Sequence, residues 1–226
     1  MAGEMVKFPS NGNEGTGYLA TPSSGSGPGV IVIQEWWGLV PHIKDVADRL
    51  ASEGFVALAP DLYNGKSTTE PDEAGKLMME MKIDDAARDM SGAVDYLIGL
   101  DAASGDKVGC VGFCVGGGLS MHLAGANSHI GVCVIYYGVL PTFQADHEAI
   151  RAPILGHYAD NDASLPVSAV RDLESNLKGL GKDVQFHIYE GTEHAFFNDS
   201  RADVYNAAAA KQSWERTLAF FRQHLG

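Results

Sequence analysis

Among the 226 residues of this sequence, Cys114 has the setting most typical of a nucleophile. It lies between Gly112 and Gly116, after a strand-like run at 107–111 and before small residues at 116–126 that predict a helix. A nucleophile at the centre of a sharp strand-to-helix turn needs such glycines, because the strained backbone passes close to its neighbours. The N-terminus of the helix favours a thiolate and a developing oxyanion. The pattern predicts a reactive thiol, although a buried structural cysteine would also fit a glycine-rich turn.

Two later loops supply an acid and a histidine, in the chain order nucleophile, acid, histidine. Asp160 and Asp162 follow the apolar run 153–157, and His194 follows the next predicted strand. A free thiol with a pKa of about 8.5 is only a few per cent thiolate at pH 7. A neighbouring histidine raises that fraction and later protonates the leaving group, while an acid fixes its tautomer. Spacing does not choose between the two aspartates, and His147, in an acidic loop, is the strongest rival to His194.

Glu35 is the other unusual residue, since it ends the most apolar predicted strand and precedes Trp36 and Trp37. A carboxylate in such a place is either exposed or held by a partner, because burying it unpaired is unfavourable. The loop after an early strand can also provide an oxyanion donor. We therefore expect the backbone N–H groups of Trp36 and Val115 to form an oxyanion hole.

Apolar runs typical of buried strands alternate with helical patterns along the chain. Strands are predicted at 29–33, 55–59, 108–111, 130–136, 153–157 and 184–189, and helices at about 40–51, 90–98, 116–126, 166–179 and 203–225. This alternation predicts an α/β fold, with a mostly parallel twisted sheet flanked by helices on both faces. Segments 6–8 and 17–20 are expected to form an N-terminal antiparallel hairpin at one edge. Segment 64–82 is the least regular and could form part of a cap over the site.

The composition limits the class of protein. A length of 226 residues suits a single domain over 1–226, and the net charge of −13 argues against nucleic acid or an anionic membrane as a partner. The sequence shows neither a signal peptide nor an apolar run of membrane-spanning length, which predicts a cytoplasmic protein. Its three cysteines make no disulfide framework, and Cys110 and Cys133 are expected in the core. Neither histidine pairs nor cysteine pairs with zinc-ligand spacing occur, so no metal or other cofactor is predicted.

Taken together, these motifs resemble the dienelactone hydrolase family (carboxymethylenebutenolidases) of α/β-hydrolases over essentially the whole chain. The motifs that carry the resemblance lie at 34–39, 59–63, 111–117, 162–166 and 191–196. The resemblance implies an α/β-hydrolase fold and a catalytic triad of Cys114, His194 and Asp162, because the family acid stands four residues before a proline, here Pro166. It also implies that Glu35 partners the thiol at rest and helps to deprotonate it when substrate binds.

The substrate-binding residues expected from the resemblance are Trp37, Tyr63, Phe196, Asn198 and Arg201. Family members hold the carboxylate of dienelactone with two arginines, and one of these positions, four residues after the histidine, is Asn198 in this chain. Arg201 either reaches the substrate or faces solvent. The other arginine would fall in the segment 64–82, where the cations are all lysines. Because a chain of charge −13 has no general field to attract an anion, a carboxylate substrate would need a local cation.

The sequence thus predicts a cysteine-dependent hydrolase that cleaves a small ester or lactone through an acyl-enzyme, as a monomer or small homo-oligomer. Its substrate need not be dienelactone. One alternative is a broader carboxylesterase or thioesterase on the same triad. The other is a non-catalytic binding or redox protein that uses an accessible thiol.

Overall fold

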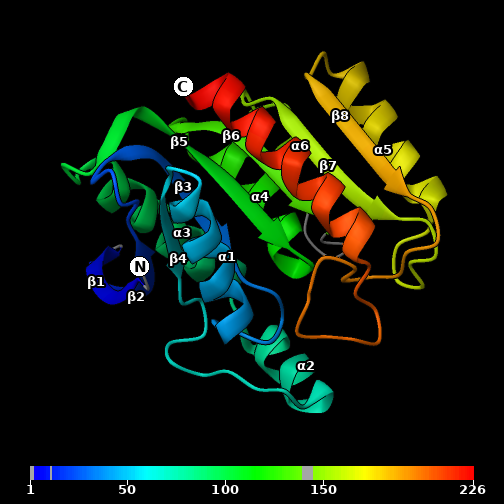
Figure 1. Cartoon of the computed structure of the whole chain (residues 1–226), viewed down its shortest axis with the longest axis horizontal. Coiled ribbons are helices and arrows are strands. Elements are labelled where there is room, and N and C mark those ends of the chain that lie inside the picture. The colour runs from blue at the N-terminus through cyan, green and yellow to red at the C-terminus, as the bar shows by residue number, and fades with distance from the viewer. Residues whose placement is uncertain (1–2, 11, 139–144) are drawn as a thin grey trace.

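The computed structural model describes residues 3–10, 12–138 and 145–226. Their strands form one sheet in the order β1-β2-β4-β3-β5-β6-β7-β8 (Figure 1). The strands are β1 (Glu4–Ser10), β2 (Asn13–Ala20), β3 (Gly27–Ile33), β4 (Val56–Pro60), β5 (Ala103–Phe113), β6 (Ile130–Tyr136), β7 (Ile154–Ala159) and β8 (Val184–Tyr189). The helices are α1 (Pro41–Ser52), α2 (Pro71–Glu80), α3 (Ile83–Ile98), α4 (Val115–Ala126), α5 (Val167–Gly179) and α6 (Ala207–Leu225).

The pairing of the strands confirms the predicted α/β architecture. From β4 to β8 all neighbours are parallel, whereas β1 pairs with β2, and β2 with β4, antiparallel. The N-terminal hairpin therefore lies at one edge of the sheet, as predicted. Because parallel strands need crossover connections, helices cover both faces of this sheet.

Side chains alternate between two buried clusters, one on each face of the sheet. Along β3, Ile31 and Ile33 belong to the cluster that includes side chains of α3, α4 and α5, while Val30 and Val32 belong to the cluster that includes side chains of α1 and α6. This period of two follows from the pleat, and it explains why the strand is apolar on both faces. In Figure 1, α6 crosses in front of the sheet and α4 lies behind it.

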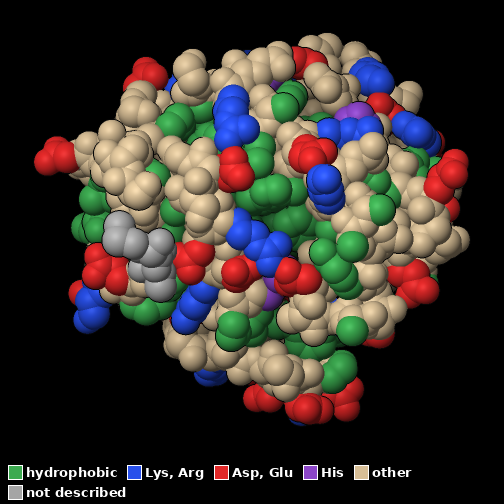
Figure 2. Space-filling view, viewed as in Figure 1, with side chains coloured by type: hydrophobic (Ala, Val, Ile, Leu, Met, Phe, Trp, Pro, Cys, Tyr) green, Lys and Arg blue, Asp and Glu red, His purple; other side chains and the backbone are tan. Residues whose placement is uncertain are grey.

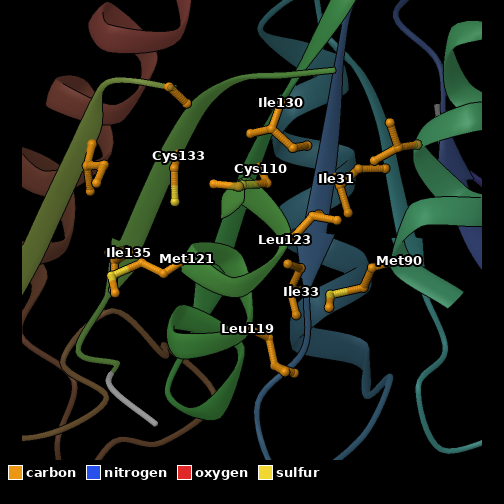
Figure 3. Close-up of a cluster of buried hydrophobic side chains, with 14 of the residues drawn as sticks. Ile31, Ile33, Met90, Cys110, Leu119, Met121, Leu123, Ile130, Cys133 and Ile135 are labelled. Atoms are coloured by element: carbon orange, nitrogen blue, oxygen red, sulfur yellow. The ribbon is translucent and has the colours of Figure 1, made fainter. Parts of the chain in front are cut away.

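Cys110 and Cys133 lie opposite each other on β5 and β6 and are fully buried (Figure 3). Ile31, Leu123 and other apolar side chains surround them on the α4 face of the sheet. All three cysteines of the chain are free thiols. The prediction that these two belong to the core is confirmed.

The structure differs from the sequence prediction mainly between residues 64 and 98. The segment 64–82 contains the regular helix α2, which begins at Pro71, a residue well suited to a first helical turn. Helix α3 begins at Ile83, seven residues before the predicted start. Its first turns bury only small residues such as Ala86, so the apolar periodicity was too weak there to reveal the helix. No helix among the described residues is long and apolar enough to cross a membrane.

Candidate active site

Cys114 lies in the sharp turn that links the end of β5 to the start of α4. Its backbone has a φ of 56° and a ψ of −120°, a strained conformation for a residue with a Cβ atom. The Cys114 N–H donates to the carbonyl oxygen of Tyr136 at 3.0 Å, and its own carbonyl accepts from the Gly117 N–H at 3.0 Å. These two bonds hold the turn, and Cys114 remains partly exposed at the carboxyl edge of the sheet.

The flanking glycines are required by close backbone contacts. A Cβ atom on Gly112 would overlap the carbonyl oxygen of Gly116, and one on Gly116 would overlap the carbonyl oxygen of Gln34. The second contact packs the end of β3 against the first turn of α4. The loop that carries Trp36 is thereby held beside the helix that begins with Val115, as an oxyanion hole made by these two residues would require.

His194 is bonded to one of the two candidate aspartates. Its Nδ1 atom lies 2.6 Å from Oδ2 of Asp162, whose other oxygen accepts from the N–H groups of Ser164 at 2.8 Å and Leu165 at 3.1 Å. The carboxylate of Asp160 instead accepts from two backbone N–H groups in the loop before His194, each at 3.0 Å. The structure thus places Asp162 behind the imidazole, while Asp160 holds the histidine loop in shape.

The other side of the His194 ring faces Cys114. Burial lowers the pKa of His194, but hydrogen bonds to Asp162 and Cys114 outweigh it and raise the pKa to about 10. An imidazole in this environment is protonated at neutral pH, which suits a partner that is a thiolate. The rival His147 lies on the loop before β7, and its electrostatic partner among the described residues is Asp146.

Glu35 is buried beside this pair, with only 1% of its surface exposed. Its carboxylate accepts from the Asn198 side-chain amide at 2.8 Å and from the Tyr137 hydroxyl at 3.4 Å. Burial raises the pKa of Glu35, against the effect of the Asn198 hydrogen bond. The resemblance implied the Cys114 thiol as the resting partner of Glu35; the hydrogen-bond partners that the structure gives are Asn198 and Tyr137.

Asn198 and Phe196, both expected to bind substrate, are almost fully buried. The Asn198 side chain is occupied by Glu35 and, through its carbonyl oxygen, by the N–H of Ser200 at 3.1 Å and the hydroxyl of Ser200 at 2.6 Å. Phe196 packs under the site against Tyr137, with ring centroids 5.5 Å apart. The structure therefore places Phe196 in the core beneath the site.

Trp37, Asn198 and Arg201, which were expected to contact substrate, line a pocket of about 610 Å³. Tyr63, also expected there, lines a different pocket together with residues of α2 and α3. The walls of the first pocket include Trp36, Trp37 and Arg201, which were predicted, and His42 and Pro71, which were not. Arg201 is paired with the exposed Asp203 at 2.6 Å. Among the residues that the structure describes, no cluster of side chains could hold a metal ion.

Sequence reasoning missed Tyr137, which the structure places at the centre of the site. Its ring lies 5.1 Å from the His194 ring, and its hydroxyl bonds to Glu35. The signal available was position alone, because Tyr137 directly follows the predicted strand at 130–136 and so stands at the carboxyl edge of the sheet.

Known proteins resemble this chain over its whole length. A model of the dienelactone hydrolase family matches residues 16–225. The chain is 43% identical over 230 residues to Protein usf of Aquifex pyrophilus and 38% identical over 230 residues to a candidate carboxymethylenebutenolidase of Aquifex aeolicus, with 99% of each chain covered in both cases. The crystal structure of a candidate dienelactone hydrolase from Klebsiella pneumoniae superposes with a TM-score of 0.89 at 28% identity, covering 99% of this chain and 100% of that one. With the α/β-hydrolase architecture already established by its sheet, the chain belongs to the dienelactone hydrolase family.

Proposed function

We propose that the protein hydrolyses a small ester or lactone through a covalent acyl-enzyme formed on Cys114. The observation that carries this proposal is the position of His194, which bonds to Asp162 on one side and faces the Cys114 thiol on the other. An imidazole held in this way can keep the sulfur as a thiolate and donate a proton later.

In the first half of the reaction, the Cys114 sulfur bonds to the carbonyl carbon while the carbonyl electrons move onto oxygen. The N–H groups of Trp36 and Val115 hold this oxyanion. The intermediate then collapses, the bond to the alkoxy oxygen breaks, and His194 gives that oxygen its proton. The alcohol leaves, or, for a lactone, remains tethered to the acyl group.

In the second half, His194 accepts a proton from water, whose oxygen attacks the thioester carbon. The carbon–sulfur bond breaks, the acid product leaves, and the sulfur returns as a thiolate beside the protonated imidazole. Asp162 holds the ring in one tautomer throughout. We also assign to Glu35 a supporting role outside this cycle: before substrate binds, it can take the proton of any Cys114 that is still a thiol, since burial raises the pKa of its carboxyl group.

The charges around the pocket favour a substrate without a carboxylate. Arg201 already pairs with Asp203, and the Asn198 amide is occupied by Glu35. Trp36 and Trp37, whose ring centroids are 4.8 Å apart, provide an aromatic wall. A neutral apolar ester fits these surroundings better than an anionic lactone does.

The decisive variant is Cys114→Ala. We expect it to abolish turnover of p-nitrophenyl acetate while circular dichroism stays unchanged, since Cys114 is only partly buried, at the border of a core cluster. Cys110→Ala, which removes a core thiol, is the matched control and should retain turnover per folded molecule. Mass spectrometry of the wild type during turnover should find one acyl group on the peptide that contains Cys114. Full activity of Cys114→Ala would refute the proposed function.

A broader thioesterase activity would use the same residues. A panel of lactones, aryl esters and thioesters, each compared by kcat/KM, ranks these substrate classes. A chain that reacts rapidly with iodoacetamide but hydrolyses none of the panel would instead be a thiol-based binding or redox protein.

A further inference from the structure

A chain of polar side chains lies in the buried layer between the sheet and α6, the helix that crosses in front of the sheet in Figure 1. His157, on β7, is fully buried in this layer. Its Nδ1 atom lies 2.9 Å from the hydroxyl of Tyr189, the last residue of β8, and its Nε2 atom lies 3.0 Å from the hydroxyl of Thr217 on α6. The Thr217 hydroxyl in turn lies 2.9 Å from that of Tyr136, the last residue of β6. These side chains therefore link the ends of the two strands on either side of β7.

The direction of the hydrogen bonds follows from the charged residue at one end of this chain. The Arg216 guanidinium donates to the Tyr189 hydroxyl at 2.9 Å, and a guanidinium can only donate. Among the described residues, the other hydrogen-bond partner of that hydroxyl is His157, so the hydroxyl proton points to Nδ1. Burial, and then the positive charges of His187 and Arg216, hold the pKa of His157 well below its usual range, so the ring is neutral. Its own proton is therefore on Nε2 and is donated to Thr217.

A network of this kind restricts the side chains that take part in it. Buried polar groups are unfavourable without partners, so a fully bonded network favours one arrangement of its members. Both ring nitrogens of His157 are bonded, and the ring cannot turn without breaking a hydrogen bond. The Tyr136 and Tyr189 rings lie 4.6 Å and 5.8 Å from the imidazole, measured between centroids. The network therefore fixes the orientation of both tyrosine rings.

These tyrosines contact the segments that carry the nucleophile and the histidine. The Tyr136 carbonyl accepts from the Cys114 N–H at 3.0 Å. The Tyr189 ring packs against Phe196, two residues after His194, with centroids 5.1 Å apart. The Tyr136 ring lies 6.5 Å from the same phenylalanine. A shift of either tyrosine would thus change the position of His194 relative to Cys114.

We propose that His157 is a positioning residue, which aligns the Cys114 sulfur with the His194 imidazole. It does so as the neutral tautomer with its proton on Nε2, through the two tyrosines that it orients. This inference rests on the proposed function, in which both halves of the reaction need a proton transfer by His194 and therefore a fixed geometry. Because His157 is fully buried beneath the carboxyl edge of the sheet, it acts through its neighbours.

Two substitutions of Thr217 separate the hydrogen bond from the packing. Thr217→Val keeps the shape of the side chain but leaves the His157 N–H without its acceptor, whereas Thr217→Ser keeps the hydroxyl and loses a methyl group. For p-nitrophenyl acetate we expect kcat to fall about 10-fold in Thr217→Val, less than the loss of about 10²-fold that a misplacement of about 1 Å can cause. KM should not change, because the pocket is walled by the loop after β3 and the segments around Pro71 and Arg201. Thr217→Ser should retain the wild-type kcat.

Alkylation of the thiol gives a readout that needs no ester hydrolysis. Iodoacetamide reacts with a thiolate, and the bond to the His194 ring favours that form of Cys114. We expect alkylation of the peptide that contains Cys114, followed by mass spectrometry at neutral pH, to be slower in Thr217→Val than in the wild type and in Thr217→Ser. The control for a loss of stability alone is Tyr18→Phe, which removes a hydrogen bond to Asp48 on the antiparallel side of the sheet. This variant should lower Tm and leave kcat and the alkylation rate unchanged.

NMR of the imidazole nitrogens distinguishes the two neutral tautomers of His157, and we expect the proton on Nε2. The inference is overturned if that proton is on Nδ1, or if Thr217→Val keeps the wild-type kcat and alkylation rate. It is also overturned if Thr217→Ser or Tyr18→Phe loses as much activity as Thr217→Val. A wild-type protein that hydrolyses no ester would refute the proposed function itself. The alkylation rates would then still decide whether His157 aligns the sulfur with the imidazole.

Discussion

At the scale of single residues, the imidazole of His194 depends on its partners for its charge. Asp162 is buried and has one oxygen occupied by backbone N–H groups, so its remaining oxygen is held at the imidazole. Folding raises the pKa of His194. The pairing with Asp162 therefore stabilises the folded chain to its full extent at pH values below about 6.5, the pKa of histidine in the unfolded chain. That stabilisation is lost as the pH rises through about 10.

We expect the alkaline limb of kcat/KM for p-nitrophenyl acetate to fall near pH 10, where His194 loses its proton. Asp162→Asn should move this limb to lower pH and reduce kcat/KM at neutral pH by about 10²- to 10⁴-fold, because the imidazolium loses its anion. Asp160→Asn, which alters only the loop support, should keep the limb in place. A pH–rate profile of the three proteins decides this, and an unshifted limb in Asp162→Asn would contradict the assignment.

Glu35 shows the opposite relation between charge and stability. Burial raises the pKa of Glu35 above its pKa in the unfolded chain. The folded chain therefore loses stability as the pH rises above the unfolded pKa, and the loss is complete above the folded pKa. Glu35→Gln keeps an acceptor oxygen for Asn198 and removes the charge. We expect its Tm at pH 8 to rise by about 2–4 °C, the shift produced by a gain of about 1 kcal/mol in a chain of this size.

The difference in Tm should vanish below about pH 4, where the carboxyl group is protonated in both states. Under the proposed role, kcat/KM should fall in the same variant. Calorimetry at several pH values tests the first expectation, and the idea of a penalised charge is wrong if Glu35→Gln is the less stable protein at pH 8.

At the scale of elements, the loop after β3 and the segment before α2 form one unit that walls the pocket. The Thr68 N–H donates to the carbonyl of Trp37 at 3.0 Å, and Gly38 forms an isolated antiparallel bridge with Ser67. Gly38 has a φ of 91°, which a residue with a Cβ atom rarely adopts. A Cβ atom there would lie 2.6 Å from the carbonyl oxygen of Lys66.

Gly38→Ala should therefore lower the free energy of unfolding by about 1–3 kcal/mol and raise KM, because it pushes the two halves of this wall apart. Gly75 is the matched control. It lies inside α2, and a Cβ atom there would meet nothing within 4 Å, so Gly75→Ala should stabilise the chain by about 0.4–1 kcal/mol. Urea unfolding and steady-state kinetics measure both effects, and equal stabilities for the two variants would count against the clash.

At the scale of the whole molecule, acidic side chains outnumber basic ones by 29 to 16. Figure 2 shows acidic and basic groups interspersed on one face, so the excess acts as a general field and not as a single patch on that face. A field of this sign lowers the local concentration of anions at every surface. It adds to the pairing of Arg201, which lines the pocket, with Asp203.

We expect the kcat/KM of an aryl ester that carries a carboxylate to rise when salt is increased from about 10 mM to about 300 mM, because screening weakens the repulsion. A neutral ester with the same leaving group should show little change and should be the better substrate at low salt. Stopped assays at several ionic strengths give both values. A preference for the anionic ester at low salt would contradict a neutral substrate class.

Much of this molecule follows from local sequence. The alternation of β-branched runs with helical patterns predicted the parallel sheet, because strands covered on both faces must be apolar on both. The spacing of Gly112, Cys114 and Gly116 predicted the turn, since only glycine tolerates the backbone contacts that the structure shows. The order of Cys114, the acidic loop and His194 then predicted their meeting at one edge, because parallel strands end together. The family resemblance and the enzyme class, a carboxylic ester hydrolase, are likewise confirmed by the family match.

Tertiary structure alone decided the partners of these residues. Spacing does not separate Asp160 from Asp162; the family resemblance favoured Asp162, and the folded structure shows that Asp162 bonds to His194 while Asp160 bonds to the backbone of the histidine loop. Asn198 and Glu35 are separated by 163 positions, yet the Asn198 amide donates to the Glu35 carboxylate. Nothing in the local sequence around Phe196 indicates that its ring is buried in the core. The physical reason is common to all of these cases: periodicity and turn chemistry act between near neighbours in the chain, whereas hydrogen bonding and burial are set by residues that only folding brings together.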